Sequence, residues 1–146
     1  MGVFQVGAST KWKSRYHFVW GTKYRHQIIT QPVANHVKET VMGVCHRYDY
    51  TYDSLGTDGD HVHLLVGAGP TLTPESIMRT VKSITARSIF ERFPSIKKVL
   101  WGGSIWATGY YWATVGDGGS EEVIRTYVIN QGTEEEKALI KQLKLL

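Results

Sequence analysis

Two histidines alternate with apolar residues in the stretch Asp60-His61-Val62-His63-Leu64-Leu65-Val66. Side chains along a β-strand point alternately to opposite faces, so His61 and His63 share one face and Val62, Leu64 and Val66 supply the other. The apolar face can enter a core. The opposite face can present two neutral imidazoles, which are common metal ligands. The alternative is a pair of partly exposed histidines that form only local hydrogen bonds.

The rest of the chain supplies further strands and helices around this strand. Aromatic and apolar residues with a period of two indicate strands, apolar residues at helical spacing indicate helices, and Gly and Asp mark a turn. In order, we predict a strand over 11–20, a helix over 32–50, a strand over 51–55, a turn over 56–59, the histidine strand and a helix over 74–93 capped by Thr73. A long strand follows over 100–115, with an interruption at Gly102-Gly103 as an alternative.

This order of elements, strand-helix-strand-strand-helix-strand, fits the split βαβ arrangement. The predicted fold class is α+β: a ferredoxin-like or RRM-like antiparallel sheet with helices on one face, followed by a C-terminal helix that carries a candidate nucleophile. The other face stays open for a ligand or for further helices. We expect one domain over 1–146, with a loose N-terminus at 1–10, a Gly-rich hinge at 115–119, a helix at 120–131 and a last helix at 133–146.

Composition limits the class of protein and of partner. The chain has 146 residues, a formal net charge of +4 and 12% aromatic residues. Its one cysteine, Cys45, excludes an internal disulfide framework and a cysteine-based zinc site. Without an apolar run near the roughly 20 residues of a membrane span, and without a signal-peptide pattern, a cytoplasmic protein with no membrane partner is expected. Basic charge beside aromatic rings favours single-stranded nucleic acid as a partner.

A second group of candidate residues lies in the helix expected over 120–131. Tyr127 and Gln131 are four residues apart and therefore share a helix face. A tyrosine can act as a nucleophile, and an amide carbonyl can ligate a hard metal ion, so one helix can supply both. The alternative is that Tyr127 only packs and Gln131 lies at the helix end. Asp60, directly before the histidines, can orient an imidazole without ligating the ion itself.

Four ordered blocks of the sequence resemble one family. His61-Val62-His63 resembles the His-hydrophobic-His motif of the HUH endonucleases, and a tyrosine followed four residues later by Gln131 resembles the Y1 transposases of the IS200/IS605 family. Tyr16–Arg25 and Leu100–Tyr111 resemble motifs of that family's first strand and later strand region. The resemblance runs from about Lys13 to Gln131, and the ordered combination is far more specific than any single block.

The resemblance implies a homodimeric DNA transposase that cleaves and rejoins single-stranded DNA at insertion-sequence ends. It implies that His61, His63 and Gln131 hold Mg²⁺ or Mn²⁺, which polarises the scissile phosphate. Tyr127 is then the nucleophile that leaves a 5′-phosphotyrosine bond and a free 3′-hydroxyl. The resemblance further implies recognition of a DNA hairpin near the element end, and active sites that combine the histidines of one subunit with the tyrosine helix of the other.

Other residues are candidates for DNA contacts. His17 lies in a matching block and is expected in the core or at DNA rather than at the metal. Packing is the default role of Tyr110 and Tyr111, although one of them is expected to face outward, where it can stack on a base. The basic residues that are candidates for phosphate contacts are Lys23, Arg25, Arg79, Lys82 and Arg87.

Three other functions stay open at this point. A replication initiator or relaxase of the HUH class shares the chemistry, although such proteins are usually larger. A catalytically silent or domesticated relative would only bind a DNA hairpin. An RRM-like RNA-binding domain needs aromatic-rich motifs on its inner strands, whereas the histidine strand carries His61, His63 and Leu65 on the candidate face.

Overall fold

The structure, a computed structural model, describes residues 4–6, 11–101 and 103–115. The helices expected over 120–131 and 133–146, with Tyr127 and Gln131, lie outside the described residues, as do residues 116–119 of the expected hinge. The described elements are β1 (Phe4–Val6), β2 (Lys11–Lys13), β3 (Arg15–Gly21), the 3-10 turn η1 (Lys23–Arg25), α1 (Gln31–Tyr48), β4 (Thr51–Asp58), β5 (His61–Gly67), α2 (Pro74–Arg92), α3 (Pro94–Val99) and β6 (Tyr111–Val115).

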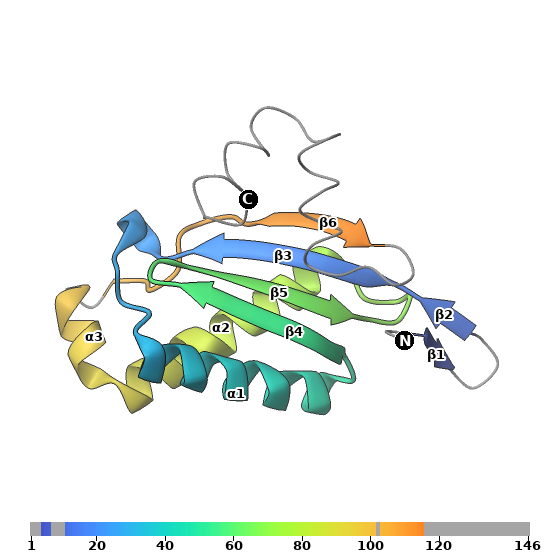
Figure 1. The fold of residues 1–146 in the computed structure, drawn as a ribbon, viewed down its shortest axis with the longest axis horizontal. Coiled ribbons are helices and arrows are strands. Elements are labelled where there is room, and N and C mark those ends of the chain that lie inside the picture. The colour runs from blue at the N-terminus through green and yellow to red at the C-terminus, as the bar shows by residue number, and fades with distance from the viewer. Residues whose placement is uncertain (1–3, 7–10, 102, 116–146) are drawn as a thin grey trace.

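A four-stranded antiparallel sheet forms the centre of the fold, in the order β4-β5-β3-β6. The hairpin of β4 and β5 packs against one edge of β3, and β6 pairs with the other edge. This order is the one that a split βαβ arrangement produces. Both long helices, α1 and α2, lie on one side of the sheet (Figure 1). The predicted ferredoxin-like α+β fold is therefore confirmed.

The hydrophobic core lies between the sheet and the two long helices. Phe18 of β3 is paired with Leu64 of β5, and both side chains are fully buried on the helix side of the sheet. Because side chains alternate along a strand, this register puts both histidines of β5 on the other face. The helices complete the core with buried residues that recur at helical spacing, namely Val33, Val37, Val41 and Val44 from α1 and Ile77, Met78, Val81 and Ile89 from α2.

Local sequence signals set the ends of α2. The Thr73 hydroxyl accepts a hydrogen bond from the Ser76 backbone N–H at 3.1 Å, and the Ser76 hydroxyl accepts one from the Thr73 N–H at 3.2 Å. This reciprocal pair satisfies two donors at the start of the helix and confirms the cap predicted at Thr73. At the other end, Pro94 cannot continue the hydrogen bonding of α2 and instead begins the short α3.

The segment after α2 differs from the strand predicted over 100–115. Pro94–Val99 is helical, and only Tyr111–Val115 forms a strand. Between them the chain is a packed loop, in which Ile105 is fully buried and its carbonyl accepts a hydrogen bond from the Lys23 backbone N–H at 2.8 Å. Apolar and aromatic content reports burial, and burial alone does not distinguish a strand from a loop that packs against one.

Smaller differences concern the N-terminal half. Phe4–Val6 falls in the range expected to be loose, and it instead pairs with β2 as a two-stranded ribbon. The strand predicted over 11–20 is divided at Ser14 into β2 and β3. β4 continues to Asp58, so the hairpin turn is shorter than the predicted 56–59.

Candidate functional site

His61 and His63 lie side by side on the sheet face turned away from α1 and α2. In the register of β4 and β5, His63 is opposite Gly56 and His61 is opposite Asp58. The two imidazole rings are stacked with their centroids 6.4 Å apart. Both residues are buried, with exposed fractions of 1% for His61 and 9% for His63. The pair is therefore an enclosed cluster and not the partly exposed pair of the alternative interpretation.

Gly56 supplies the space that the His63 ring occupies. A Cβ atom at position 56 would overlap with Nε2 and Cε1 of the imidazole. A larger residue would therefore displace either the ring or the strand, because protein interiors are close-packed. The sequence pattern assigns Gly56 to a turn and so misses this contribution. The available signal was a glycine in one arm of a hairpin, close to a histidine in the other arm.

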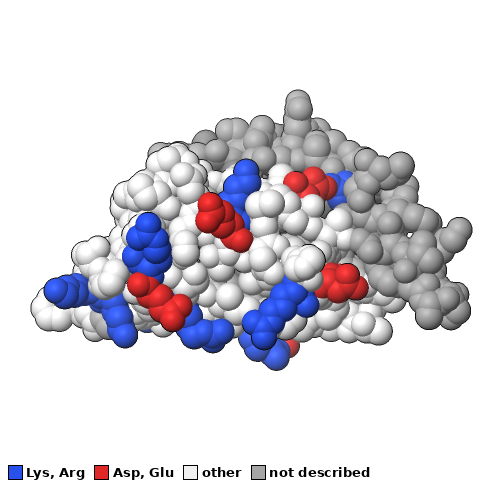
Figure 2. Space-filling view, turned by 90° about the horizontal axis from the view of Figure 1, so that it is seen from below, with Lys and Arg blue, Asp and Glu red and all other residues white. Residues whose placement is uncertain are grey.

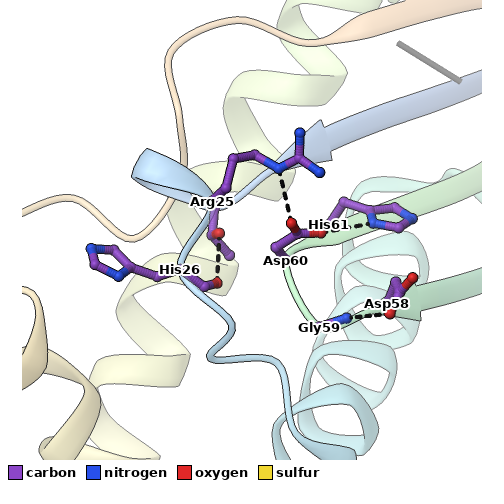
Figure 3. A network of polar contacts seen from close by, with 7 residues as sticks. Arg25, His26, Asp58, Gly59, Asp60 and His61 are labelled. Atoms are coloured by element: carbon purple, nitrogen blue, oxygen red, sulfur yellow. Dashed lines mark hydrogen bonds and ion pairs between the residues drawn. The ribbon is translucent and has the colours of Figure 1, made fainter. Parts of the chain in front are cut away.

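Asp60 connects His61 to Arg25 at the end of the sheet (Figure 3). Its Oδ2 atom accepts a hydrogen bond from Arg25 Nε at 2.9 Å, and its Oδ1 atom lies 3.2 Å from His61 Nδ1. Burial acts to raise the pKa of the Asp60 carboxyl, but the hydrogen bonds and charges of Arg25 and His61 outweigh burial, so this pKa lies below its ordinary value. An ionised carboxylate here favours the proton on Nδ1, which leaves the lone pair of a neutral ring on Nε2.

His17 and Tyr111 form a second row on the histidine face. The His17 ring centroid lies 6.0 Å from that of His63 and 6.5 Å from that of Tyr111. His17 is buried, but on the side of the sheet opposite the hydrophobic core. Tyr110 lies on the other side, where its ring contacts Phe18. In the part of the chain that the structure describes, no three His, Cys, Asp or Glu side chains are grouped to hold a metal ion, so His17 does not complete such a set.

The basic residues proposed as phosphate contacts fall into two separate regions. One is the turn after β3, which carries Arg25 beside Asp60. The other is a groove of about 580 Å³ between α2 and residues 103–110, which we call the α2 groove. The first region holds Lys23 and Arg25, and the second holds Arg79, Lys82 and Arg87.

Side chains in the α2 groove already have partners within the protein. Lys82 Nζ donates hydrogen bonds to the carbonyl oxygens of Ala107 and Gly109 at 2.8 and 3.1 Å. Burial lowers the pKa of Lys82. Arg79 pairs with Glu75 one helical turn earlier, with an N–O distance of 3.1 Å. On the side of the molecule that the helices cover, acidic and basic side chains are interspersed (Figure 2).

Comparison with known proteins assigns the chain to a family. Residues 10–131 match the family described as IS200-like transposases. The chain belongs to this family. The ISDra2 transposase TnpA of Deinococcus radiodurans is 30% identical to this IS200-like transposase over 129 residues, which cover 88% of this chain and 91% of the relative. The transposase for insertion sequence element IS200 of Salmonella typhimurium is 28% identical over 137 residues, covering 94% and 88%.

Solved structures share the fold of this IS200-like transposase. A crystal structure of a Deinococcus radiodurans protein assigned to the transposases matches with a TM-score of 0.72 and 32% identity, covering 87% of this chain and 97% of the other. A REP-associated tyrosine transposase bound to a REP hairpin matches with a TM-score of 0.52 and 9% identity, covering 88% and 77%. Among the described helices, none is long and apolar enough to cross a membrane.

Proposed function

We propose that this transposase cleaves and rejoins single-stranded DNA through a covalent bond between Tyr127 and a 5′-phosphate. The observation that carries the proposal is the buried pair of imidazoles on one sheet face, with a carboxylate beside the first imidazole. Such a pair is costly to bury without a role, because each ring brings polar nitrogen atoms into a closed site. Membership of a transposase family supports DNA as the substrate class.

A divalent cation, Mg²⁺ or Mn²⁺, fits the donors of the histidine face. His61 and His63 offer two imidazole rings, and Asp60 favours the His61 tautomer whose lone pair is on Nε2. The amide oxygen of Gln131 is a hard ligand of the type that these cations prefer, and their coordination shells keep positions for phosphate oxygens and water. When bound, the cation polarises the scissile phosphate and stabilises the charge that develops on it.

The covalent step exchanges one phosphate ester for another. The Tyr127 phenolic oxygen loses its proton and bonds to phosphorus, while the bond from phosphorus to the 3′-oxygen breaks and that oxygen gains a proton. In the second step another 3′-hydroxyl attacks the phosphotyrosine, and Tyr127 recovers its proton. Because the number of ester bonds is unchanged, the two steps are close to balanced in energy and need no nucleotide hydrolysis.

We further propose a DNA hairpin near each element end as the recognised feature, and a homodimer as the active form. The resemblance to Y1 transposases supports both. A relative with the same fold is described as bound to a REP hairpin. The formal net charge of +4 suits a polyanionic partner. In this homodimer the tyrosine helix of one subunit acts beside the histidines of the other.

The direct test is a denaturing gel of the protein with single-stranded oligonucleotides that tile the DNA flanking its gene. We expect an SDS-resistant protein–DNA adduct that requires Mg²⁺ or Mn²⁺, disappears with chelator and is lost in Tyr127→Phe. Tyr48→Phe is the matched control, because Tyr48 is an exposed tyrosine at the end of α1 and should leave the adduct unchanged. An adduct that persists in Tyr127→Phe contradicts the assigned nucleophile, and tight hairpin binding without any adduct indicates a silent relative.

Mixing two inactive variants tests the shared active site. His63→Ala removes a proposed metal ligand and Tyr127→Phe removes the nucleophile, so each homodimer is expected to be inactive. A mixed dimer restores one complete site if the tyrosine helix acts beside the partner's histidines. We expect the adduct to reappear on mixing, and only on the His63→Ala subunit, which retains its tyrosine. An adduct that never reappears, although subunits exchange, contradicts docking between subunits.

A further inference from the structure

The turn after β3, Thr22–His26, holds an exposed aromatic ring on a strained backbone. Tyr24 has a φ of 56° and Arg25 has a φ of 57°, so two consecutive residues other than glycine lie in the left-handed region. This conformation is unfavourable for bulky side chains and persists only where the surroundings enforce it. The Tyr24 side chain is nevertheless 81% exposed, so the strain does not serve to bury the ring.

Five hydrogen bonds hold the turn in this conformation, one of them from the His26 N–H to the Lys23 carbonyl at 3.4 Å. The Thr22 N–H donates to the Asp60 carbonyl at 2.8 Å, and the Lys23 N–H donates to the Ile105 carbonyl at 2.8 Å. Within the turn, the Arg25 N–H donates to the Thr22 carbonyl at 3.1 Å, and the Thr22 hydroxyl donates to the carbonyl of His26 at 2.8 Å. The backbone is therefore fixed while the ring of its central residue projects outward. A ring that projects from an ordered turn can bind a partner without the added cost of ordering the loop that carries it.

The turn is also bonded to the candidate metal site. Arg25, the residue after Tyr24, bonds to the Asp60 carboxylate, and the same carboxylate contacts His61 (Figure 3). Tyr24 thus directly precedes, in the chain, the arginine that holds the carboxylate beside a proposed metal ligand. Lys23 Nζ lies 5.6 Å from the centre of this ring and adds a positive charge.

A flat aromatic ring next to a lysine matches the chemistry of one unpaired nucleotide. The base can stack on the ring, which is sequence-tolerant because every base has a π-face, and the phosphate can contact the ammonium group. We propose that Tyr24 is a stacking platform for an unpaired base of the DNA strand near the scissile phosphate, with Lys23 at a neighbouring phosphate. This inference rests on the proposed single-strand cleavage and adds a positioning residue to it.

The α2 groove is a weaker candidate for this role. It has aromatic walls, including Phe90 and Tyr110, but two of its three basic residues are engaged within the protein. Lys82 holds two loop carbonyls and Arg79 pairs with Glu75. The turn, by contrast, offers a ring with only Lys23 and His26 as its ring contacts among the described residues.

Tyr24→Gly separates stacking from folding. Glycine accepts a φ of 56° without strain, so this variant should melt at a higher temperature than the parent while losing the ring. Because the stacked ring is lost, we expect affinity for single-stranded DNA to fall about tenfold, measured by fluorescence anisotropy in the Tyr127→Phe background. Tyr24→Phe and Tyr24→Trp should retain affinity. The matched control is Tyr48→Ala, which removes another exposed tyrosine, with Arg47 over its ring at 5.4 Å.

A fluorescent base locates the stacked position. We would place 2-aminopurine at each position in turn along the bound oligonucleotide and expect one position, next to the mapped cleavage site, to be quenched with Tyr24 and bright with Gly. Unchanged affinity in Tyr24→Gly, or the same fluorescence profile in both proteins, overturns the stacking inference. If the wild-type protein still forms its Tyr127 adduct in that case, the cleavage proposal stands. Tyr24-dependent binding without any adduct contradicts the cleavage chemistry and not the stacking.

Discussion

Two regions of this transposase combine aromatic rings with basic side chains, and they use them in opposite ways. In the α2 groove the basic side chains are engaged: Lys82 holds the loop before β6, and Arg79 pairs with Glu75. In the turn after β3 the backbone is engaged, and the ring of Tyr24 is left exposed beside Lys23. In the groove, charged side chains stabilise the fold. In the turn, backbone hydrogen bonds position an aromatic side chain at the surface.

This difference shows why residue type alone does not locate a nucleic-acid surface. Lys23 and Lys82 have the same side chain and were equal candidates from the sequence. Their partners distinguish them, because the Lys82 ammonium group already donates to two loop carbonyls and cannot move to a phosphate without giving up those hydrogen bonds.

The largest effect is expected from His63→Ala. Loss of residues that merely support a metal ligand typically costs 10- to 100-fold, so loss of a ligand should lower the rate of adduct formation more than about 100-fold. Arg79→Gln, on the wall of the α2 groove where Arg79 already pairs with Glu75, should change that rate less than about threefold. The measurement is a time course on denaturing gels with a Mn²⁺ titration. Equal losses in both variants would break the distinction between the two regions.

Gly56→Ala should be the next most damaging change to activity. The added methyl group would overlap with the His63 ring, so we expect the rate of adduct formation to fall about 10- to 100-fold through a misplaced imidazole. Gly43→Ala is the control, because this exposed glycine of α1 has no atom within 4 Å of an added Cβ. Alanine there should stabilise the fold by about 0.5–1 kcal/mol, measured by urea unfolding, and should leave activity intact.

If Gly56→Ala instead keeps full activity, His63 tolerates displacement and its assignment as a ligand is weakened. A Mn²⁺ titration separates the two ways of losing activity. A displaced ligand raises the metal concentration needed for half-maximal rate, whereas a general distortion of the sheet lowers the melting temperature without that shift.

The sequence predicts the fold well where a pattern is local. The alternation around Val62 gives the correct strand and face, and Thr73 gives the correct helix start, because both depend on neighbours within a few residues. The strand predicted over 100–115 is wrong over most of its length, since loop residues such as Ile105 are apolar for a tertiary reason: they pack at the end of β3.

The site could be predicted only in part for the same physical reason. The histidine pair is visible as a period of two within one strand. Gly56, Arg25 and His17 reach that pair from other elements, and their contributions depend on strand register and on a turn with positive φ angles. Register is set by the whole sheet and not by a local motif.

A smaller effect, on stability, distinguishes the two lysines. Lys82→Met leaves two carbonyl oxygens without their donor, so we expect the free energy of unfolding to fall by about 1–2 kcal/mol while affinity for single-stranded DNA stays within about twofold. Lys23→Met should do the reverse, with stability unchanged and DNA affinity reduced about threefold to tenfold. Urea unfolding and fluorescence anisotropy on the same samples make the comparison, which fails if both lysines affect the same quantity.

The smallest effect is expected at the exposed ion pair of α2. Glu75 and Arg79 are both largely solvent-exposed, and such pairs contribute about 0–1 kcal/mol because water and salt screen them. Glu75→Gln should therefore change stability by less than about 0.5 kcal/mol.

The same type of substitution near the histidines gives the contrast. Asp60→Asn replaces a mostly buried partner of Arg25 and His61, and it should reduce metal affinity about 10- to 100-fold. Because both substitutions exchange a carboxylate for an amide of nearly the same shape, a difference in the Mn²⁺ titration between them reflects where the charge lies.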